Sequence, residues 1–291
     1  FQPDTFTRKL RTYMRHRKNL IQMSATHINM MQKALEQMNI KLQHVIADIT
    51  GKSGQEIIKA IIRGERNPEE LYLYCQGRIK PEKKDAIIKS LNGVWKEEHI
   101  FELEQSYSIF NFYHEKIKEC DANIEKHLRE KSGVDTYEKV KPKAKSNKNN
   151  LNFNAKEILQ ELTGTDLSEI FGITESNAIE IISEVGLEGI KKFPSAKHFA
   201  SWLRLSPNNK ISGGKVLSSR IPKGSNRLKI ALRNAANAIG NLKDSTPLAD
   251  FFKRINQVKA ENKDYISDVR DVNNVYVEHE DIKLVIYRDS G

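Results

Sequence analysis

Cysteine is scarce in this sequence, since the 291 residues include only Cys75 and Cys120. Two cysteines this far apart exclude a disulfide framework, and no CxxC or Cys/His spacing predicts a zinc site. The eight histidines stand singly along the chain. We therefore expect an intracellular, reducing environment and no metal site in this chain.

Long apolar runs are also missing. No stretch approaches the roughly 20 apolar residues that span a bilayer, and the N-terminus lacks the basic and apolar regions of a secretory signal. These absences predict a cytoplasmic protein without a membrane partner. Aromatic residues make up 8% of the chain and are scattered, so the sequence predicts no stacking platform for single-stranded nucleic acid.

Positive charge is what the sequence has in excess. It contains 48 Lys+Arg against 38 Asp+Glu, a formal net charge of +10, which favours a polyanionic partner. Eight acids and one lysine lie from Ala155 to Glu188, whereas Gly189 to Lys243 contains twelve Lys+Arg and no acid. We expect this second stretch to form a surface that neutralises phosphates, with an ordinary basic surface as the alternative.

Hydrophobic periodicity predicts a mainly α-helical fold. One long helix is expected from Arg8 to Ile49 and another from Trp95 to Lys131, because their apolar residues recur at three- and four-residue spacings. Shorter helices around Gln55 to Arg63 and Glu82 to Leu91 would form a tip between them. The main seam positions are Ile21, Ile28, Leu35, Leu42 and Ile49 in the first helix and Leu103, Phe110, Ile117 and Ile124 in the second.

Composition divides the chain into four parts. Residues 1–138 are expected to form a long antiparallel coiled-coil hairpin that mediates homo-oligomerisation. Residues 139–153 read as a lysine-rich linker, either a solvated tether or a strap along a phosphate backbone. A small helix-hairpin-helix-like DNA-binding domain should occupy residues 154–256. The tail, residues 257–291, carries eight acids and five Lys+Arg and has strand-like content.

The run GITESNAIEIISEVG carries the helix-hairpin-helix-like pattern. Thr174 is positioned to cap a helix whose apolar face includes Ala178 and Ile182, and Gly186 is expected to end it. Such a hairpin can present backbone N–H groups to a DNA phosphate. Plain core packing by an amphipathic helix is the alternative interpretation.

A loop rich in Gly, Ser and Lys follows further along the chain. It lies between a helix with Phe199, Trp202 and Leu203 on its apolar face and a second helix that Ser225 can cap. Its centre reads Ser212-Gly213-Gly214-Lys215, where glycine permits close approach of the backbone to a ligand. The cations expected around it are Lys210, Lys215, Arg220, Lys223 and Arg227.

Phosphoryl transfer through a protein nucleophile needs an exposed hydroxyl flanked by cations that stabilise charge on the phosphate oxygens. Ser212 meets the compositional part of that requirement. A phosphate-binding turn without catalysis is the alternative. A nucleotide P-loop is excluded, because GxxxxGK[ST] is absent.

Several stretches together resemble a family of bacterial insertion-sequence transposases. The similar segments are SAKHFASWLRLSPNNKISGGK, SNRLKIALRNAANAI, GITESNAIEIISEVG and PLADFFKRI, with further likeness upstream, so that the resemblance covers about residues 4 to 256. Members of that family combine an N-terminal DEDD domain of Holliday-junction-resolvase-like fold with a C-terminal serine-containing transposase domain. They act as RNA-guided recombinases.

The resemblance implies a role for each part of the loop. In the family, the serine of the SGGK-like loop joins covalently to DNA, which maps onto Ser212, with Ser218 and Ser219 in reserve. It also implies DNA and possible guide RNA as partners, and a nucleoid-associated location in a bacterium. From charge and position, we assign nucleic-acid binding to Lys210, Gly213, Gly214, Lys215, Arg220, Lys223 and Arg227.

Two departures from the family pattern matter. The family's four metal-binding acids lie upstream of the region that matches residues 1–17, so a divalent metal such as Mg²⁺ would belong to an acidic domain absent from this sequence. The acidic tail replaces a basic, alanine-rich helix. We therefore expect a truncated transposase that is inactive by itself; the alternative is a non-catalytic DNA- or RNA-binding oligomerisation module.

Overall fold

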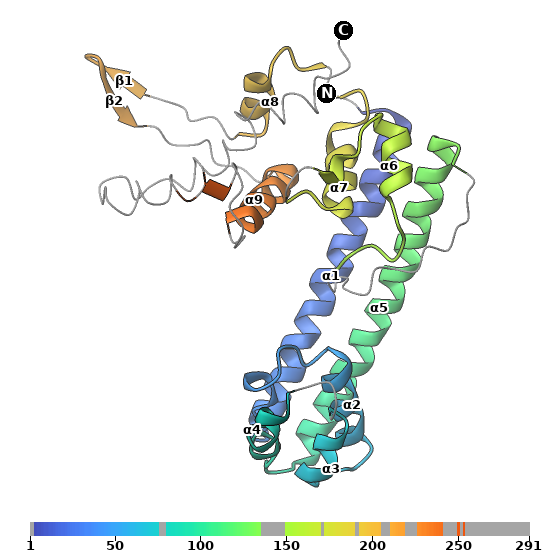
Figure 1. The fold of residues 1–291 in the computed structure, drawn as a ribbon, viewed down its shortest axis with the longest axis vertical. Helices are drawn as coiled ribbons and strands as arrows, with labels where there is room; N and C mark the ends of the chain where they lie inside the picture. Colours follow the sequence, from blue (N-terminus) through green and yellow to red (C-terminus); the bar gives the residue numbers. More distant parts are fainter. Residues whose placement is uncertain are drawn as a thin grey trace. The chain divides into compact units, whose positions relative to one another are not determined.

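The computed structural model describes residues 3–75, 80–134, 149–169, 172–189, 192–204, 210–218 and 226–240, together with 249, 250 and 253. This part of the chain is mostly helical, as predicted (Figure 1). It forms two compact units, which we call the helical unit, His16–Cys120, and the terminal unit, Phe1–Arg15 with Asp121–Gly291.

The elements follow one another in this order. The α-helices are α1 (Thr5–Gln37), α2 (Lys52–Ile62), α3 (Pro68–Leu73), α4 (Lys84–Ser90), α5 (Glu97–Ser132), α6 (Lys156–Thr163), α7 (Glu175–Val185), α8 (Ala196–Trp202) and α9 (Arg227–Gly240). Short 3-10 turns are η1 (Leu42–His44), η2 (Pro81–Lys83) and η3 (Leu167–Glu169). The strands are β1 (Lys210–Ser212) and β2 (Lys215–Ser218).

The first long helix ends at Gln37, so the prediction that it continues to Ile49 was wrong. Asn39 adopts a left-handed conformation with φ of 57°. Its N–H bonds to the Glu36 carbonyl at 2.8 Å, and the next N–H, of Ile40, reaches back to the Leu35 carbonyl at 2.9 Å. This is a Schellman termination, which asparagine favours almost as glycine does. The seven-residue spacing of apolar residues continues beyond the end of α1 only because Leu42 and Ile49 are buried in the same cluster as Leu35.

Within the helical unit, α1 and α5 pack against each other and run antiparallel. Met31 and Leu35 of α1 share one apolar cluster with Leu103 and Phe110 of α5. The second long helix lies within two residues of its predicted bounds. The interlocking seam of a coiled coil is a finer statement and stays a prediction.

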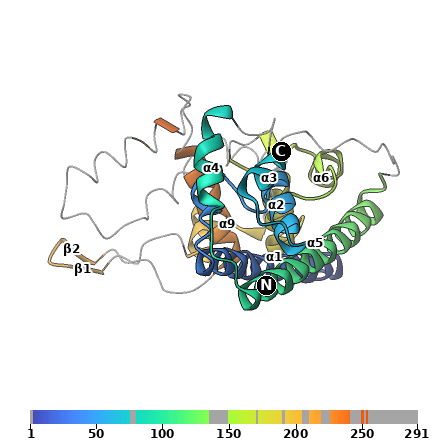
Figure 2. The same cartoon turned by 90° about the horizontal axis from the view of Figure 1, so that it is seen from below.

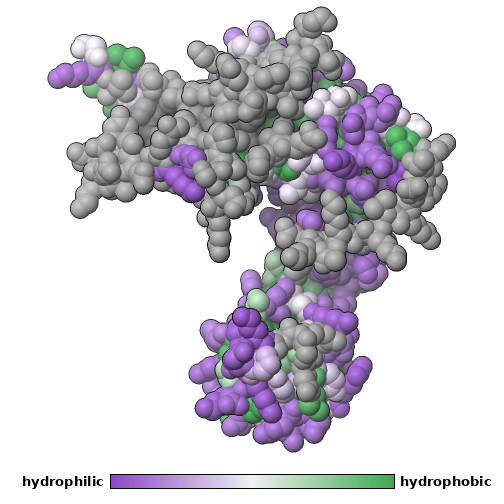
Figure 3. Space-filling view, in the orientation of Figure 1, coloured by the Kyte–Doolittle hydropathy of each residue, from purple (hydrophilic) through white to green (hydrophobic). Residues whose placement is uncertain are grey.

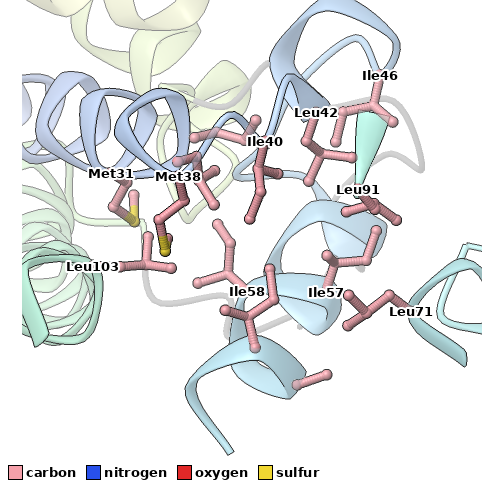
Figure 4. Packing of buried hydrophobic residues seen from close by; sticks show 14 of the residues in the cluster. Met31, Met38, Ile40, Leu42, Ile46, Ile57, Ile58, Leu71, Leu91 and Leu103 are labelled. Atoms are coloured by element: carbon pink, nitrogen blue, oxygen red, sulfur yellow. The ribbon is translucent and has the colours of Figure 1, made fainter. Parts of the chain in front are cut away.

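The tip between the two long helices is built from α2, α3 and α4, which gather near the end of α1 (Figure 2). Their apolar residues point into one buried cluster with Met31, Met38 and Leu103 (Figure 4). Pro68 is the first residue of α3. Proline suits that position because it has no N–H to leave unpaired, and the Asn67 side chain accepts the N–H of Glu69 at 2.9 Å.

The terminal unit assembles around the first turns of α1 and the last turns of α5. Asp4 is the N-cap of α1, and its carboxylate accepts a hydrogen bond from the Thr7 N–H at 2.7 Å. Phe6 stacks on His127 of α5 with ring centroids 4.7 Å apart. Asp121, also on α5, is buried and accepts the Asn152 side-chain amide at 2.7 Å. The Asp121–Asn152 hydrogen bond therefore ties the segment that leads into α6 to this end of the long helices.

Two predicted segments fall largely or wholly outside the described residues: the lysine-rich linker, of which residues 139–148 are not described, and the tail, 257–291. Among the residues that the structure does describe, no helix is long and apolar enough to cross a membrane.

Candidate nucleic-acid interface

Helix α7 forms as the sequence predicts. Thr174 accepts the Asn177 N–H at 3.2 Å as the N-cap, and Gly186, with φ of 86°, ends the helix. Ala178, Ile182 and Val185 are buried. The apolar face of α7 is thus used in core packing, which is the alternative considered for this run; a helix-hairpin-helix role in DNA binding stays a prediction.

Two arginines of α1 hold the C-terminal end of α7. Arg11 donates to the carbonyls of Ser183 and Glu184 at 2.9 and 2.8 Å. Arg15 forms a bidentate pair with the Glu184 carboxylate, at 3.0 and 2.8 Å. Cations and donors at a helix C-terminus satisfy its last carbonyls and complement its dipole. This arginine clamp, Arg11 and Arg15 on Glu184, positions the helix on which the candidate interface is built.

A small apolar cluster joins α7 to α8 and α9. It contains Val185, Phe199, Ala200, Leu203 and Leu228, with Ile181, Phe193 and Leu232 packed around it. Helix α9 is capped by Asn226, whose side-chain oxygen accepts the Leu228 N–H at 3.0 Å. The predicted cap, Ser225, lies outside the described residues, and asparagine caps at least as well as serine.

The predicted Gly/Ser/Lys loop contains an antiparallel β-hairpin. Strands β1 and β2 pair so that Ser212 lies opposite Lys215 and Ile211 opposite Val216. The turn residues Gly213 and Gly214 have φ of 55° and 74°. Positive φ at both central positions is what a type I′ two-residue hairpin turn requires, and glycine supplies it without strain. The run was too short for its alternation to be recognised from sequence.

The hairpin contains five of the predicted site residues, namely Lys210, Ser212, Gly213, Gly214 and Lys215. Residues directly opposite each other in an antiparallel pair share a face, and so do residues two apart along a strand. Ser212 and Lys215 are direct partners and therefore lie on the same face, whereas a register shift between Lys210 and Ile211 interrupts the alternation before it reaches Lys210. All three residues are exposed. The surface of the hairpin shows both hydrophilic and hydrophobic residues (Figure 3). The exposed hydrophobic ones include Ile211 and Leu217.

The turn itself is open. A Cβ placed on Gly213 or Gly214 would meet no atom within 4 Å, so an approaching ligand has free access to this backbone.

The remaining predicted residues are half-buried or lie outside the described part of the chain. Arg227 is the half-buried first residue of α9, and Ser218 is half-buried at the end of β2, opposite Lys210. Arg220, Lys223 and Ser219 lie outside the described residues.

A second group of cations was missed by sequence reasoning. We call Arg204, Lys229 and Arg233 the α8–α9 cation cluster. The Lys229 ammonium donates to the Arg204 carbonyl at 2.9 Å. Partial burial lowers the pKa of Lys229, and repulsion from Arg233 and Arg204 lowers it further. The one available signal was the four-residue spacing of Lys229 and Arg233, which places both on one face of α9.

Three aromatic residues also converge in this segment. Phe193 lies 5.1 Å from Phe199 and 5.5 Å from Trp202 between ring centroids. Phe199 is buried, whereas Trp202 is 37% exposed at the end of α8. Tertiary packing brings together rings that are several residues apart in the sequence.

No group of three or more His, Cys, Asp and Glu side chains suited to a metal ion occurs in the part of the chain that the structure describes. The divalent metal implied by the resemblance therefore finds no fitting ligand set among these residues.

Comparison with known proteins finds a family model that is similar to one segment of the chain. Residues 164–250 match the model of the IS116/IS110/IS902 transposase family. The matched range begins at Gly164, the left-handed residue that ends α6, and includes α7, α8, the hairpin and α9. No curated protein and no solved structure shows significant similarity to the chain. The match supports an insertion-sequence transposase role and covers every residue of the candidate interface.

Proposed function

We propose that the chain acts in insertion-sequence transposition, with the segment 164–250 binding DNA and Ser212 acting as the nucleophile in strand cleavage and rejoining. The family match supports the transposase part of this proposal. The observation that carries the finer part is the exposed Ser212 directly opposite the exposed Lys215, next to the open glycine turn, with the exposed Lys210 at the start of the same strand.

The chemistry is a transesterification at phosphorus. The Ser212 oxygen attacks a phosphodiester, a serine–phosphorus bond forms, and the bond from phosphorus to one deoxyribose oxygen breaks. The proton of the Ser212 hydroxyl passes to a general base, and the departing deoxyribose oxygen takes up a proton. The number of phosphodiester links is conserved, so the reverse attack by a DNA hydroxyl rejoins a strand without an energy source.

The neighbouring residues have separate roles in this proposal. Lys210 and Lys215 would stabilise the negative charge that builds up on the phosphate oxygens. The open glycine turn, Gly213 and Gly214, would let the DNA backbone approach closely. Arg220, Lys223 and Arg227 would contact nucleic-acid phosphates, either DNA or a guide RNA. Self-association through α1 and α5 belongs to the same proposal.

A divalent metal would have to be held by residues other than those described, because no fitting ligand set occurs among them. We derive no step of the Ser212 reaction from it.

The test is a covalent adduct between protein and DNA. The chain is incubated with its cognate DNA and guide RNA, together with the acidic domain that the resemblance implies. Denaturing electrophoresis then detects protein joined to labelled DNA. We expect the adduct with the natural chain and a reduction of at least about 1,000-fold with Ser212→Ala, because a methyl group offers no attacking atom.

Ser218→Ala is the matched control, since Ser218 is a second serine of the same hairpin and its loss should leave the adduct unchanged. Adduct formation that survives Ser212→Ala and disappears with Ser218→Ala would reassign the nucleophile. Persistence in both variants would place it outside the hairpin.

A further inference from the structure

We propose that the α8–α9 cation cluster, Arg204, Lys229 and Arg233, is a binding site for the sugar–phosphate backbone of a nucleic acid, separate from the hairpin. The proposal rests on the proposed function in one respect, namely that this segment binds nucleic acid. It adds a site that carries no chemistry itself and anchors the strand while the hairpin engages it.

Two elements bring the three side chains together. Arg204 follows the end of α8, and its carbonyl accepts the Lys229 ammonium of α9 at 2.9 Å. Arg233 lies four residues after Lys229, on the same face of α9. Both arginines are exposed, and Lys229 is half-buried between the two helices. A phosphate at this surface would therefore meet two guanidinium groups and one ammonium.

The local electrostatics favour an anion. Lys229 lies in the first turn of α9, next to the positive end of the helix dipole, and that turn contains no acid. Burial and the charges of Arg233 and Arg204 lower the pKa of Lys229. The fold thus holds cations close together where their repulsion is unfavourable, and a bound phosphate would relieve that repulsion.

The conformation of Arg204 is a further reason to assign it a role. Its φ is 57°, in the left-handed region where glycine or asparagine is favoured and a long side chain is strained. Sequences commonly place glycine at this position after a helix. An arginine there keeps a guanidinium at the site despite the backbone strain, which is typical of functional positions.

One contact of the cluster has a structural role. Lys229 binds the carbonyl of Arg204 and so stabilises the end of α8, as a cation near a helix C-terminus does. That bond needs neither the Arg204 side chain nor Arg233. Substitution of the two arginines therefore distinguishes a phosphate-binding role from a helix-capping role, and the experiment uses these substitutions.

The planar guanidinium groups suit phosphodiester oxygens, which they can bind in pairs. This chemistry is common to DNA and RNA. Trp202 is exposed two residues before Arg204, so its fluorescence can report on occupancy.

The experiment compares the natural chain with Arg204→Gly, Arg233→Gln and the double variant. Glycine at position 204 suits the observed φ, so this variant should keep its stability while losing the cation. Affinities for a 20-base-pair DNA duplex and for an RNA duplex of equal length are measured by fluorescence anisotropy over a series of salt concentrations. We expect each substitution to weaken binding severalfold and to reduce the slope of log K against log salt by about 0.9 for each lost phosphate contact on DNA.

Arg63→Gln is the matched control, because Arg63 is an exposed arginine that follows a helix, α2, in the helical unit. Its slope should equal that of the natural chain. In a Trp95→Phe background, nucleic acid should quench Trp202 in the natural sequence and fail to do so in the double variant.

The outcomes separate this proposal from the proposed function. Unchanged slope and quenching in the double variant would overturn the cluster as a site, while a Ser212-dependent adduct would leave the transposase proposal standing. A slope reduced on both duplexes supports a common backbone site, and a reduction on one duplex alone supports that nucleic acid as its ligand. A natural chain that binds neither duplex would overturn both proposals.

Discussion

Different interactions stabilise the interior of each of the two compact units. The helical unit buries one large apolar cluster drawn from α1 to α5, with Met31, Leu35, Ile57 and Leu103 fully inaccessible. The apolar cluster between α7, α8 and α9 in the terminal unit is much smaller. There the long helices are joined to α7 by the arginine clamp. Burial of apolar area dominates in the first unit, and charge-assisted hydrogen bonds contribute a larger share in the second.

The two units also differ in the residues that they expose at the surface. The visible surface of the helical unit is largely hydrophilic, with hydrophobic residues scattered over it (Figure 3). The terminal unit contains the exposed Lys210 and Lys215 of the hairpin and the α8–α9 cation cluster. A region that keeps cations exposed and close together has less freedom to build a large apolar core, so polar anchors assume part of that role.

The two tryptophans allow the units to be followed separately. Trp95 belongs to the helical unit and Trp202 to the terminal unit. In a Trp202→Phe background, the remaining Trp95 therefore reports on the helical unit during urea unfolding. In a Trp95→Phe background, the remaining Trp202 reports on the terminal unit.

The largest expected effect comes from Leu35→Lys. Leu35 is fully buried in the cluster of the helical unit. The substitution removes apolar contacts and places an unpaired ammonium among apolar side chains, so the free energy of unfolding should fall by about 4 kcal/mol or more. Trp95 fluorescence during urea unfolding measures the loss.

Ala25→Lys supplies the control, because it adds the same charge to an exposed position of α1 and should change stability by less than about 0.5 kcal/mol. Equal effects of the two substitutions would show that the α1–α5 contact contributes little.

A smaller effect is expected from Arg11→Met in the terminal unit. The substitution keeps most of the side-chain length and removes the two donors to the α7 carbonyls. Loss of charge-assisted bonds at a partly buried helix end should lower the free energy of unfolding by about 2 kcal/mol. Trp202 fluorescence should report the change, and the unfolding followed by Trp95 should shift less.

Arg8→Met tests whether the clamp is specific. Arg8 lies one turn earlier on α1, is exposed, and donates to the Thr5 side chain within its own helix. Its removal should have almost no effect. If Arg8→Met and Arg11→Met proved equally destabilising, net charge rather than the clamp would be the cause.

The smallest effect concerns acid stability through Asp166. Burial alone would raise the pKa of this carboxyl, but hydrogen bonds from Lys156 and Ser168 outweigh burial and lower it below 3.8. A carboxyl with a lowered folded pKa stabilises the fold above its unfolded pKa, and this stabilisation is lost as pH falls through the folded value. Asp166→Asn should therefore cost about 1 kcal/mol at pH 7, and the difference should shrink below about pH 4.

The measurement is urea unfolding of both proteins from pH 7 to pH 3. Asp85→Asn, at an exposed position of α4, should match the natural chain throughout. A difference between Asp166→Asn and the natural chain that stays constant down to pH 3 would show that ionisation of Asp166 does not contribute.

Much of the fold could be predicted from periodicity. The bounds of α5 and α7 follow from seven-residue spacing, from the cap at Thr174 and from Gly186. The end of α1 was mispredicted because Leu42 and Ile49 continue the spacing while folding back into the same core. A linear pattern does not distinguish a helix that continues from a chain that returns.

The candidate site was predictable only in part. Ser212, Lys210 and Lys215 stood out because hydroxyl, glycine and cations are adjacent in sequence. Arg204 did not stand out, because its partner Lys229 lies 25 residues later in the sequence. Its left-handed backbone conformation is also not one that the residue type arginine predicts.

The sequence by itself determined the helical character, the excess of cations in 189–243 and the glycine pair at the hairpin turn, because each depends on residues close together along the chain. Only the tertiary structure decided that α1 stops at Gln37, that two arginines hold the end of α7, and that Arg204 meets Lys229. These features depend on which helices come into contact, and that is settled by burial of apolar area over the whole unit rather than by any local run of residues.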